Sequence, residues 1–279
     1  MYHGQKVPGF PRHPHRGFET LTVVSKGFID HADSLGASAR YGDGDAQWLT
    51  AGDGINHSEM FPLFSQNGNN KLDFFQIWLN LPSYNKRVEP NFEMYWEDEI
   101  PKISSNLNGN KNVQVEIITG DYLDFSSPIA PKNSWANNKK NDVAVWIIRL
   151  DKSGKFAIPD TKSGAKRNLY VLKGSNIEVD GQSISGGSMV TLDSSKNTVI
   201  KNLGSKTKIL MLQGVPINEP VVKYGPFVMN KRSEIEQAFY DYNRTEFGGW
   251  QWGNSDPVHG TQKEKFAKLI SGKIIKPAK

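Results

Sequence analysis

Three histidines and one glutamate have the residue types and the spacing of a metal site. His13 and His15 are one residue apart in the run H-P-H-R-G-F-E, and His57 and Glu59 repeat this spacing in A-G-D-G-I-N-H-S-E. Side chains alternate between the two faces of a strand, so each pair points to one side of its strand. If the two strands are neighbours, the four side chains converge. Three imidazoles and a carboxylate suit iron, manganese, nickel or copper better than calcium.

The alternative is that the histidine spacing arose by chance, as a single His-x-His often does. Against this, half of the six histidines in the chain lie in these two short motifs. Glycines stand beside both motifs, as expected where strands turn tightly around a buried ion. The sequence therefore favours a metal site.

The composition is that of a folded protein. The chain has 279 residues, of which 37% are hydrophobic and 11% aromatic, enough for one large domain or two domains with packed cores. There is no cysteine, which excludes disulfides, cysteine-bound zinc and thiol nucleophiles. No apolar run reaches the length of a membrane span, and the start does not read as a signal peptide. We expect a soluble cytoplasmic protein with no membrane partner.

The positive charge is spread along the chain. The net charge is +5 and the isoelectric point is about 9.1, yet only the tail, from Lys263 to Lys279, is dense in lysine. A nucleic-acid surface would need a basic stripe with aromatic residues between the charges, so we expect no direct nucleic-acid partner. We expect residues 261–279 to be a basic tail that packs loosely.

The rest of the chain alternates between strand-like runs and turns. Residues 72–79 are nearly all apolar, which predicts a strand buried on both faces. His31 and Asp33 follow a Lys-Gly turn, and we expect them to be hydrogen-bonding residues of a short loop, with a role in a pocket as the alternative. The clearest helix is predicted at residues 233–243, where Ser233 and Glu236 have the spacing of a capping box. Further strands are predicted at residues 18–29, 113–118, 142–150, 168–172, 175–179, 189–192 and 209–212.

Longer motifs give the chain a family resemblance. His13-x-His15-x-x-x-Glu19 followed by Gly54-x-x-His57 resembles the two metal motifs of the cupin superfamily. Longer motifs along the chain are similar to those of the pirin family in particular. The motifs that carry this resemblance are H-P-H-R-G-F-E-T at 13–20, Q-W-L-T-A-G-x-G-I-x-H-S-E at 47–59, Q-I-W-L-N-L-P at 76–82, L-Q-G-x-P-I-x-E-P-V-V at 212–222, Y-G-P-F-V-M-N at 224–230 and F-G-G-W at 247–250.

The resemblance implies an all-β fold of two cupin-type barrels, a bicupin with a few short helices. The expected domains are a metal-binding N-terminal cupin at residues 1–105 and a C-terminal cupin-like domain at 106–260. The chain has no histidine between Ser58 and Val258, so the second domain cannot form a histidine metal site. Residues 1–12 have loop composition and lead directly into the motif. Compared with the family, the N-terminal barrel is therefore expected to lack its first strands, unless the start codon was assigned too late.

The resemblance also implies a ligand set and a metal. The expected ligands are His13, His15, His57 and Glu59, with Glu19 as a reserve ligand or a residue that orients one. Fe(II) is the expected metal, and manganese, nickel, copper and zinc are the alternatives.

Two functions remain open from the sequence. Some pirins and related bicupins are quercetin 2,3-dioxygenases, which implies a flavonol and dioxygen as substrates, with Glu59 as the catalytic base. Animal pirins are associated with transcription-factor complexes and other bacterial pirins with metabolic enzymes, which implies a regulator with a protein partner. A metal with a mainly structural role is a third possibility, because a fold does not fix a function.

Overall fold

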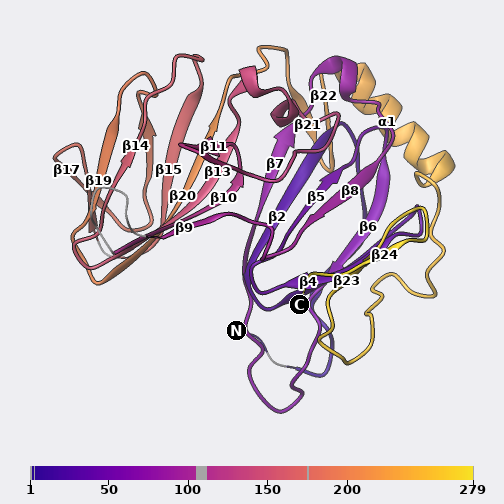
Figure 1. Ribbon diagram of the computed structural model, residues 1–279. Coiled ribbons are helices and arrows are strands. Elements are labelled where there is room, and N and C mark those ends of the chain that lie inside the picture. The colour runs from indigo at the N-terminus through magenta and orange to yellow at the C-terminus, as the bar shows by residue number, and fades with distance from the viewer. Residues whose placement is uncertain (1, 3, 105–111, 175, 279) are drawn as a thin grey trace. The chain divides into compact units, whose positions relative to one another are not determined.

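The fold is made almost entirely of strands (Figure 1). The computed structural model describes residues 2, 4–104, 112–174 and 176–278, and the all-β prediction is confirmed. The chain divides into two compact units, one of residues 1–99, 131–134 and 217–279 and the other of residues 100–130 and 135–216. The expected boundary between residues 105 and 106 lies outside the described residues and stays a prediction. The assignment of residues 217–260 to the second domain differs from the structure, which places them with the N-terminal half.

The first unit has two sheets, one in the order β1-β6-β3-β4-β23-β24 and one in the order β7-β2-β5-β8. The six-stranded sheet consists of β1 (Gly9–His15), β6 (Ile55–Met60), β3 (Phe28–Asp33), β4 (Ser38–Gly42), β23 (Phe266–Lys268) and β24 (Ile274–Ile275). The four-stranded sheet consists of β7 (Asp73–Asn80), β2 (Phe18–Lys26), β5 (Ala46–Thr50) and β8 (Asn91–Tyr95), and the short helix η1 (Ser83–Asn85) follows β7.

The core of the first unit lies between these two sheets. Ile29, Tyr41 and Ile55 come from the six-stranded sheet and form one buried cluster with Val24 and Leu49 of the four-stranded sheet. The sheets therefore pack face to face, each contributing alternate side chains to the shared interior. The expectation that this barrel lacks its first strands stays a prediction.

The expectation of a loose C-terminal tail is wrong. Strand β23 pairs with β4, with Ala267 opposite Ala39, and the last strands lie beside β4 in Figure 1. The preceding segment is held by Arg40, whose guanidinium donates to the carbonyl oxygens of Gly260 and Gln262 while it binds both carboxylate oxygens of Asp30 at 2.6 Å. The strand was not predicted because the apolar stretches in this part of the chain are short and lie between lysines.

The predicted helix is confirmed as α1 (Arg232–Thr245), which follows the hairpin of β21 (Val222–Tyr224) and β22 (Phe227–Met229). Its cap differs from the prediction. The carboxylate of Glu234 accepts the backbone N–H groups of Asn230 and Lys231 at 2.9 Å each. The predicted capping residue Glu236 instead lies 3.6 Å from Arg232 on the exposed face of the helix.

The second unit is a separate double sheet with its own core. Its sheets have the orders β18-β15-β20-β13-β10-β9 and β14-β19-β16-β17, and side chains from both, such as Trp146 and Phe156, form one cluster. The elements are β9 (Lys102–Ser104), β10 (Val113–Thr119), β11 (Asp121–Tyr122), β12 (Phe125–Ser126), η3 (Trp135–Asn137), η4 (Lys139–Asn141), β13 (Ala144–Asp151), β14 (Lys155–Ile158), β15 (Lys166–Lys173), β16 (Asn176–Val179), β17 (Gln182–Ser185), β18 (Met189–Leu192), β19 (Thr198–Asn202) and β20 (Lys206–Gly214).

The strand predicted to be buried on both faces is a half-exposed edge strand. β7 pairs only with β2 in its sheet, and none of its residues is fully buried. Its apolar composition therefore reflects half-buried packing at a sheet edge.

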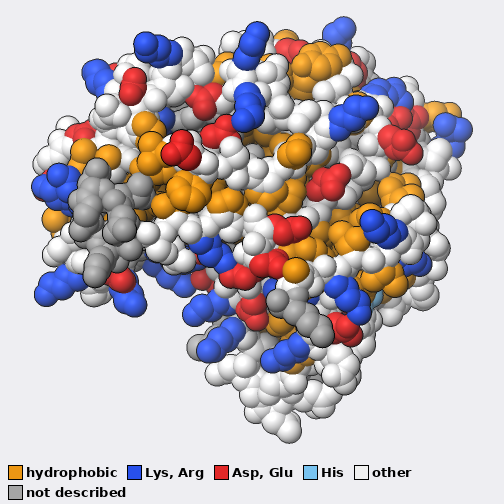
Figure 2. Space-filling model, viewed as in Figure 1, with side chains coloured by type: hydrophobic (Ala, Val, Ile, Leu, Met, Phe, Trp, Pro, Cys, Tyr) orange, Lys and Arg blue, Asp and Glu red, His pale blue; other side chains and the backbone are white. Residues whose placement is uncertain are grey.

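The surface drawn in Figure 2 mixes charges of both signs. Lysine and arginine side chains are dispersed among acidic ones over this face. No helix among the described residues is long and apolar enough to cross a membrane.

Candidate metal centre

Three histidine side chains meet inside the first unit. His13 and His15 extend from β1 and His57 from β6, which pair antiparallel with His13 directly opposite His57. The ring centroids are 4.8 Å apart for His13 and His15, 4.4 Å for His13 and His57, and 4.9 Å for His15 and His57. One ligand atom from each ring lies within 4.8 Å of the other two. Among the described residues, no other group of three such side chains comes this close together.

The local backbone explains why the pairs converge. Opposite residues of an antiparallel pair share a face, and period-two alternation adds His15 and Glu59 to the face of His13 and His57. After His15 the chain leaves β1 at Gly17, whose φ of +85° lies in the left-handed region. A Cβ at this position would collide with the carbonyl oxygen of Val228. Glycine therefore permits the sharp passage from one sheet to the other.

Burial keeps two of the histidines neutral. His57 is fully buried and His15 is 4% exposed. Burial, and then the neighbouring His13, lower the pKa of His15 from 6.5 to about 3. Burial followed by His13, His15 and His31 lowers the pKa of His57 well below its ordinary value. A neutral imidazole offers a lone pair, which is the protonation state that a metal ligand needs.

The hydrogen bonds of these rings fit a metal site. Neither ring nitrogen of His57 has a hydrogen-bond partner among the described residues, although both are buried. Buried polar atoms without partners are uncommon and costly unless something else satisfies them. His13 places Nδ1 2.8 Å from the carbonyl oxygen of Pro11, which leaves its other nitrogen available. The residues present therefore fit a metal ion bound among the three rings.

Glu59 stands at the edge of this cluster. Its Oε2 lies 4.0 Å from Nε2 of His57, but it is not within the set of mutually close ligand atoms. The amide of Gln76 donates to both carboxylate oxygens at 3.0 Å each, and the Thr22 hydroxyl donates at 3.3 Å. These donors hold the carboxylate beside the histidines.

The structure does not bring Glu19 into the group of mutually close ligand atoms, and its role as a reserve ligand or orienting residue stays a prediction. The turn at Gly17 separates its strand from that of His15. Glu19 accepts hydrogen bonds from Thr50 at 2.8 Å and from Ser134 at 2.6 Å. Burial, partly offset by these hydrogen bonds, raises the pKa of its carboxyl from 4.5 to about 7.

His31 and Asp33 lie in strand β3 rather than in the expected loop, and the sequence did not predict which residues of the cluster they would face. Asp33 is opposite His57 and His31 is opposite Glu59 in the pairing of β3 with β6. Their side chains therefore share the face of the cluster. Nε2 of His31 lies 3.0 Å from Asp33 Oδ2, and its ring centroid is 5.5 Å from that of His57. The one-residue spacing of His31 and Asp33 was the signal available in the sequence.

Aromatic side chains cover the cluster beside β7. Trp78 lies 5.5 Å from the ring of His15 and 4.3 Å from that of Phe18, and it remains 39% exposed. Its indole N–H donates to Oε1 of Gln76 at 3.0 Å. A chain of contacts thus runs from the surface through Trp78 and Gln76 to Glu59.

The fold and the cluster together define a class. This is an all-β protein of the cupin type whose first unit carries a histidine cluster that could hold a metal. Two family models match, Pirin over residues 1–79 and Pirin C-terminal cupin domain over residues 145–248.

Similar proteins extend this match over most of the chain. A "Putative quercetin 2,3-dioxygenase" of Pseudomonas aeruginosa is 32% identical over 243 residues, which span 87% of this chain and 80% of that protein. Human pirin is 32% identical over 252 residues, with 88% and 80% covered. A crystal structure of quercetin 2,3-dioxygenase from Acinetobacter baumannii matches with a TM-score of 0.78 at 30% identity, over 89% of this chain and 82% of that one. The chain belongs to the pirin family.

Proposed function

We propose that this protein is a metal-dependent flavonol 2,3-dioxygenase of the quercetin type. The observation that carries the proposal is the cluster of three converging imidazoles, in which both buried nitrogens of His57 lack a hydrogen-bond partner among the described residues. The similarity to quercetin 2,3-dioxygenases supports the choice of reaction.

The proposed ligands are His13, His15 and His57, with Glu59 as a fourth. Fe(II) is the proposed metal, and manganese, nickel, copper and zinc are the alternatives to be tested against it. Such a metal, when bound, supplies a site where a chelating enol and dioxygen exchange electrons within one complex.

Glu59 has two roles in this proposal. While the site is free of substrate, its carboxylate completes the ligand set beside His57, from which it is 4.0 Å away. When a flavonol binds, the carboxylate accepts the proton of the 3-hydroxyl group, which makes that oxygen a better ligand. Gln76 and Thr22 keep the carboxylate oriented through their hydrogen bonds.

The direct test is oxygen uptake by protein reloaded with Fe(II) without air. We expect quercetin to start oxygen consumption, and we expect Glu59→Gln to retain iron but lose most of this activity. Because glutamine keeps the size of the side chain, lost activity with retained iron assigns the proton transfer to Glu59. Iron-loaded wild-type protein that consumes no oxygen with any flavonol would contradict the dioxygenase proposal.

The second candidate is a metal-dependent regulator that binds a protein partner. It is favoured by the packing of Phe18 and Trp78 against the buried ring of His15, which narrows the space beside one of the proposed ligands. The same experiment separates the two, since a regulator binds iron stoichiometrically without flavonol-dependent oxygen consumption.

A further inference from the structure

The ligand-bearing strands of the first unit are held by a segment from the far end of the chain. We call residues 226–247 the C-terminal clamp; they comprise β22, α1 and the turns beside them. We propose that this clamp sets the position of His15 and His57 and thereby the metal affinity of the site. The inference rests on the proposed metal site and adds the residues that position its ligands.

The first contact is made directly to His15. Its Nδ1 lies 3.4 Å from the carbonyl oxygen of Pro226, a contact that is a hydrogen bond only when Nδ1 carries the proton. That tautomer leaves the lone pair on Nε2 for a metal. Carbonyl groups that accept from a ligating histidine fix both its tautomer and its ring orientation.

The backbone beside His15 is tied to the same strand of the clamp. Arg16 forms a parallel bridge with Phe227, and the N–H of Val228 donates to the Arg16 carbonyl at 3.0 Å. The buried ammonium of Lys86 donates to the carbonyl oxygens of Gly17 at 2.8 Å and Val228 at 2.9 Å. β1 is an edge strand of its sheet, so the clamp supplies the contacts that a second neighbouring strand would otherwise make.

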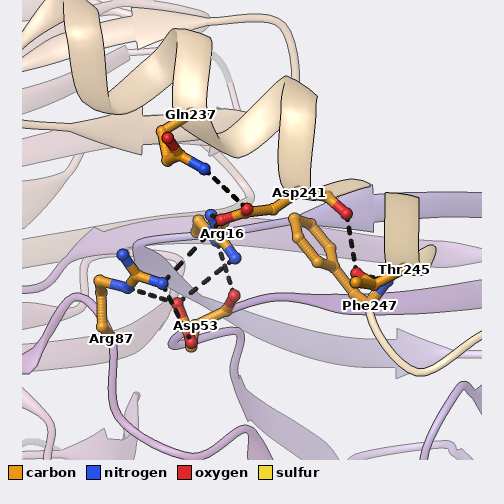
Figure 3. Close-up of polar contacts among 7 residues, drawn as sticks. All are labelled: Arg16, Asp53, Arg87, Gln237, Asp241, Thr245 and Phe247. Atoms are coloured by element: carbon orange, nitrogen blue, oxygen red, sulfur yellow. Dashed lines mark hydrogen bonds and ion pairs between the residues drawn. The ribbon is translucent and has the colours of Figure 1, made fainter. Parts of the chain in front are cut away.

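The side chain of Arg16 joins the clamp to both ligand strands (Figure 3). Its Nη1 donates to Asp241 of α1 at 2.8 Å, and its Nε donates to the carbonyl oxygen of Asp53 at 2.6 Å. Asp53 lies in the loop that leads into β6, the strand of His57. Arg87 lies 2.7 Å from the Asp53 carboxylate and 3.9 Å from that of Asp241. Two arginines and two aspartates thus form one network over the ligand strands.

The His57 strand has contacts of its own with the clamp. Asn56 donates to the carbonyl oxygen of Glu246 at 2.7 Å. The Phe247 ring lies 4.5 Å from the guanidinium of Arg16 and packs on Gly54, where a Cβ would come within 2.6 Å of the ring. The clamp therefore reaches the backbone next to both His15 and His57.

These contacts make Arg16 and Asp241 positioning residues. Neither is a proposed ligand, yet the carboxylate of Asp241 is the acceptor on α1 that fixes the guanidinium next to His15. Removing it breaks the side-chain bond that ties Arg16, and with it the backbone next to His15, to α1. Some residues orient a metal ligand without touching the metal themselves. Substituting such a residue typically weakens metal binding by about 10- to 100-fold.

The test is a titration of the metal-free full-length chain with Co(II), followed by visible absorption, in which band position and intensity report ligand geometry. We expect Asp241→Ala to weaken Co(II) binding by about 10-fold or more and to change the absorption bands. Asp241→Asn retains an oxygen that can accept from Arg16, so its affinity should lie between those of wild type and Asp241→Ala.

Glu236→Ala is the matched control. It removes an acid from the same helix, but its side chain is 70% exposed and pairs with Arg232 on the surface, so it should bind Co(II) as the wild type does. If Asp241→Ala fails to fold, Asp241→Asn decides the test through its affinity and spectrum.

Wild-type affinity and an unchanged spectrum in the folded Asp241 variants would overturn the clamp alone. Absence of Co(II) binding in the wild type would overturn the proposed metal site, and the clamp with it.

Discussion

The buried carboxyl of Glu19 should make the first unit less stable as the pH rises. Its side chain is fully buried, and burial raises its pKa from 4.5 to about 7. Between these two values the folded chain holds a proton that the unfolded chain releases. Stability is therefore lost progressively as the pH rises through this window, and the loss is complete above the folded-state pKa.

The size of the effect follows from the gap between the two pKa values. A gap of about 2.5, at about 1.4 kcal/mol per pKa unit, corresponds to about 3 kcal/mol. Glu19→Gln removes the ionisation while it resembles the protonated carboxyl in shape. The hydroxyls of Thr50 and Ser134, which donate to Glu19 in the structure, can each turn to accept from an amide N–H instead.

The assay is urea unfolding of the metal-free protein at a series of pH values from 5 to 8. Because other groups titrate in this range, the quantity to follow is the difference in unfolding free energy between Glu19→Gln and wild type. Between pH 5 and pH 8 we expect this difference to grow by about 2 to 3 kcal/mol in favour of the variant. Glu89→Gln, at an exposed carboxyl of the same unit, should show no such growth.

Two results would refute this reasoning. One is a free-energy difference between Glu19→Gln and wild type that stays constant across the series. The other is a difference that moves toward the wild type as the pH rises, because that would mean that the ionised carboxylate is stabilised inside the fold.

Three further predictions concern buried charges and the proposed base. Lys86→Met should cost about 2 kcal/mol or more of unfolding free energy, since it leaves the buried carbonyl oxygens that Lys86 serves without a donor; an unchanged urea midpoint would contradict this. Asp30→Asn breaks the buried pair with Arg40 and should cost about 3 to 5 kcal/mol of unfolding free energy, whereas Glu264→Gln at an exposed pair should leave the urea midpoint close to that of the wild type; equal losses would refute the distinction. Glu59→Gln should lower the flavonol turnover number while iron content stays at the wild-type level, and unchanged turnover would remove Glu59 as the base.

The spacing of residues was enough to predict the parts of the site that lie in two paired strands. His13, His15 and His57 share one face because strand alternation and antiparallel pairing leave few other arrangements. The same rule does not extend to Glu19, because β1 ends before Gly17 and the strand of Glu19 belongs to another sheet. Alternation holds within a strand and carries no information across a turn.

Contacts between distant parts of the sequence were beyond this kind of reasoning. The helix of Asp241 was predicted from its periodicity, but its partner Arg16 lies near the other end of the chain and no local pattern links them. The pairing of β23 with β4 is similar, since three residues next to a lysine-rich stretch give no strand signal. The apolar run in β7 predicted a strand correctly, but composition did not reveal that it lies at a sheet edge.

The most direct test of the three-histidine metal site is the number of metal ions bound per chain. Metal-free wild type, His57→Ala and His259→Gln would be loaded with Fe(II) without air, freed of unbound iron and analysed for metal per chain. His259 is the control because its Nε2 donates to the backbone carbonyl oxygen of His31 at 2.7 Å and it is not one of the three clustered histidines. We predict one iron per chain for wild type and for His259→Gln, and essentially none for His57→Ala. Full iron content in His57→Ala, or none in the wild type, would contradict it.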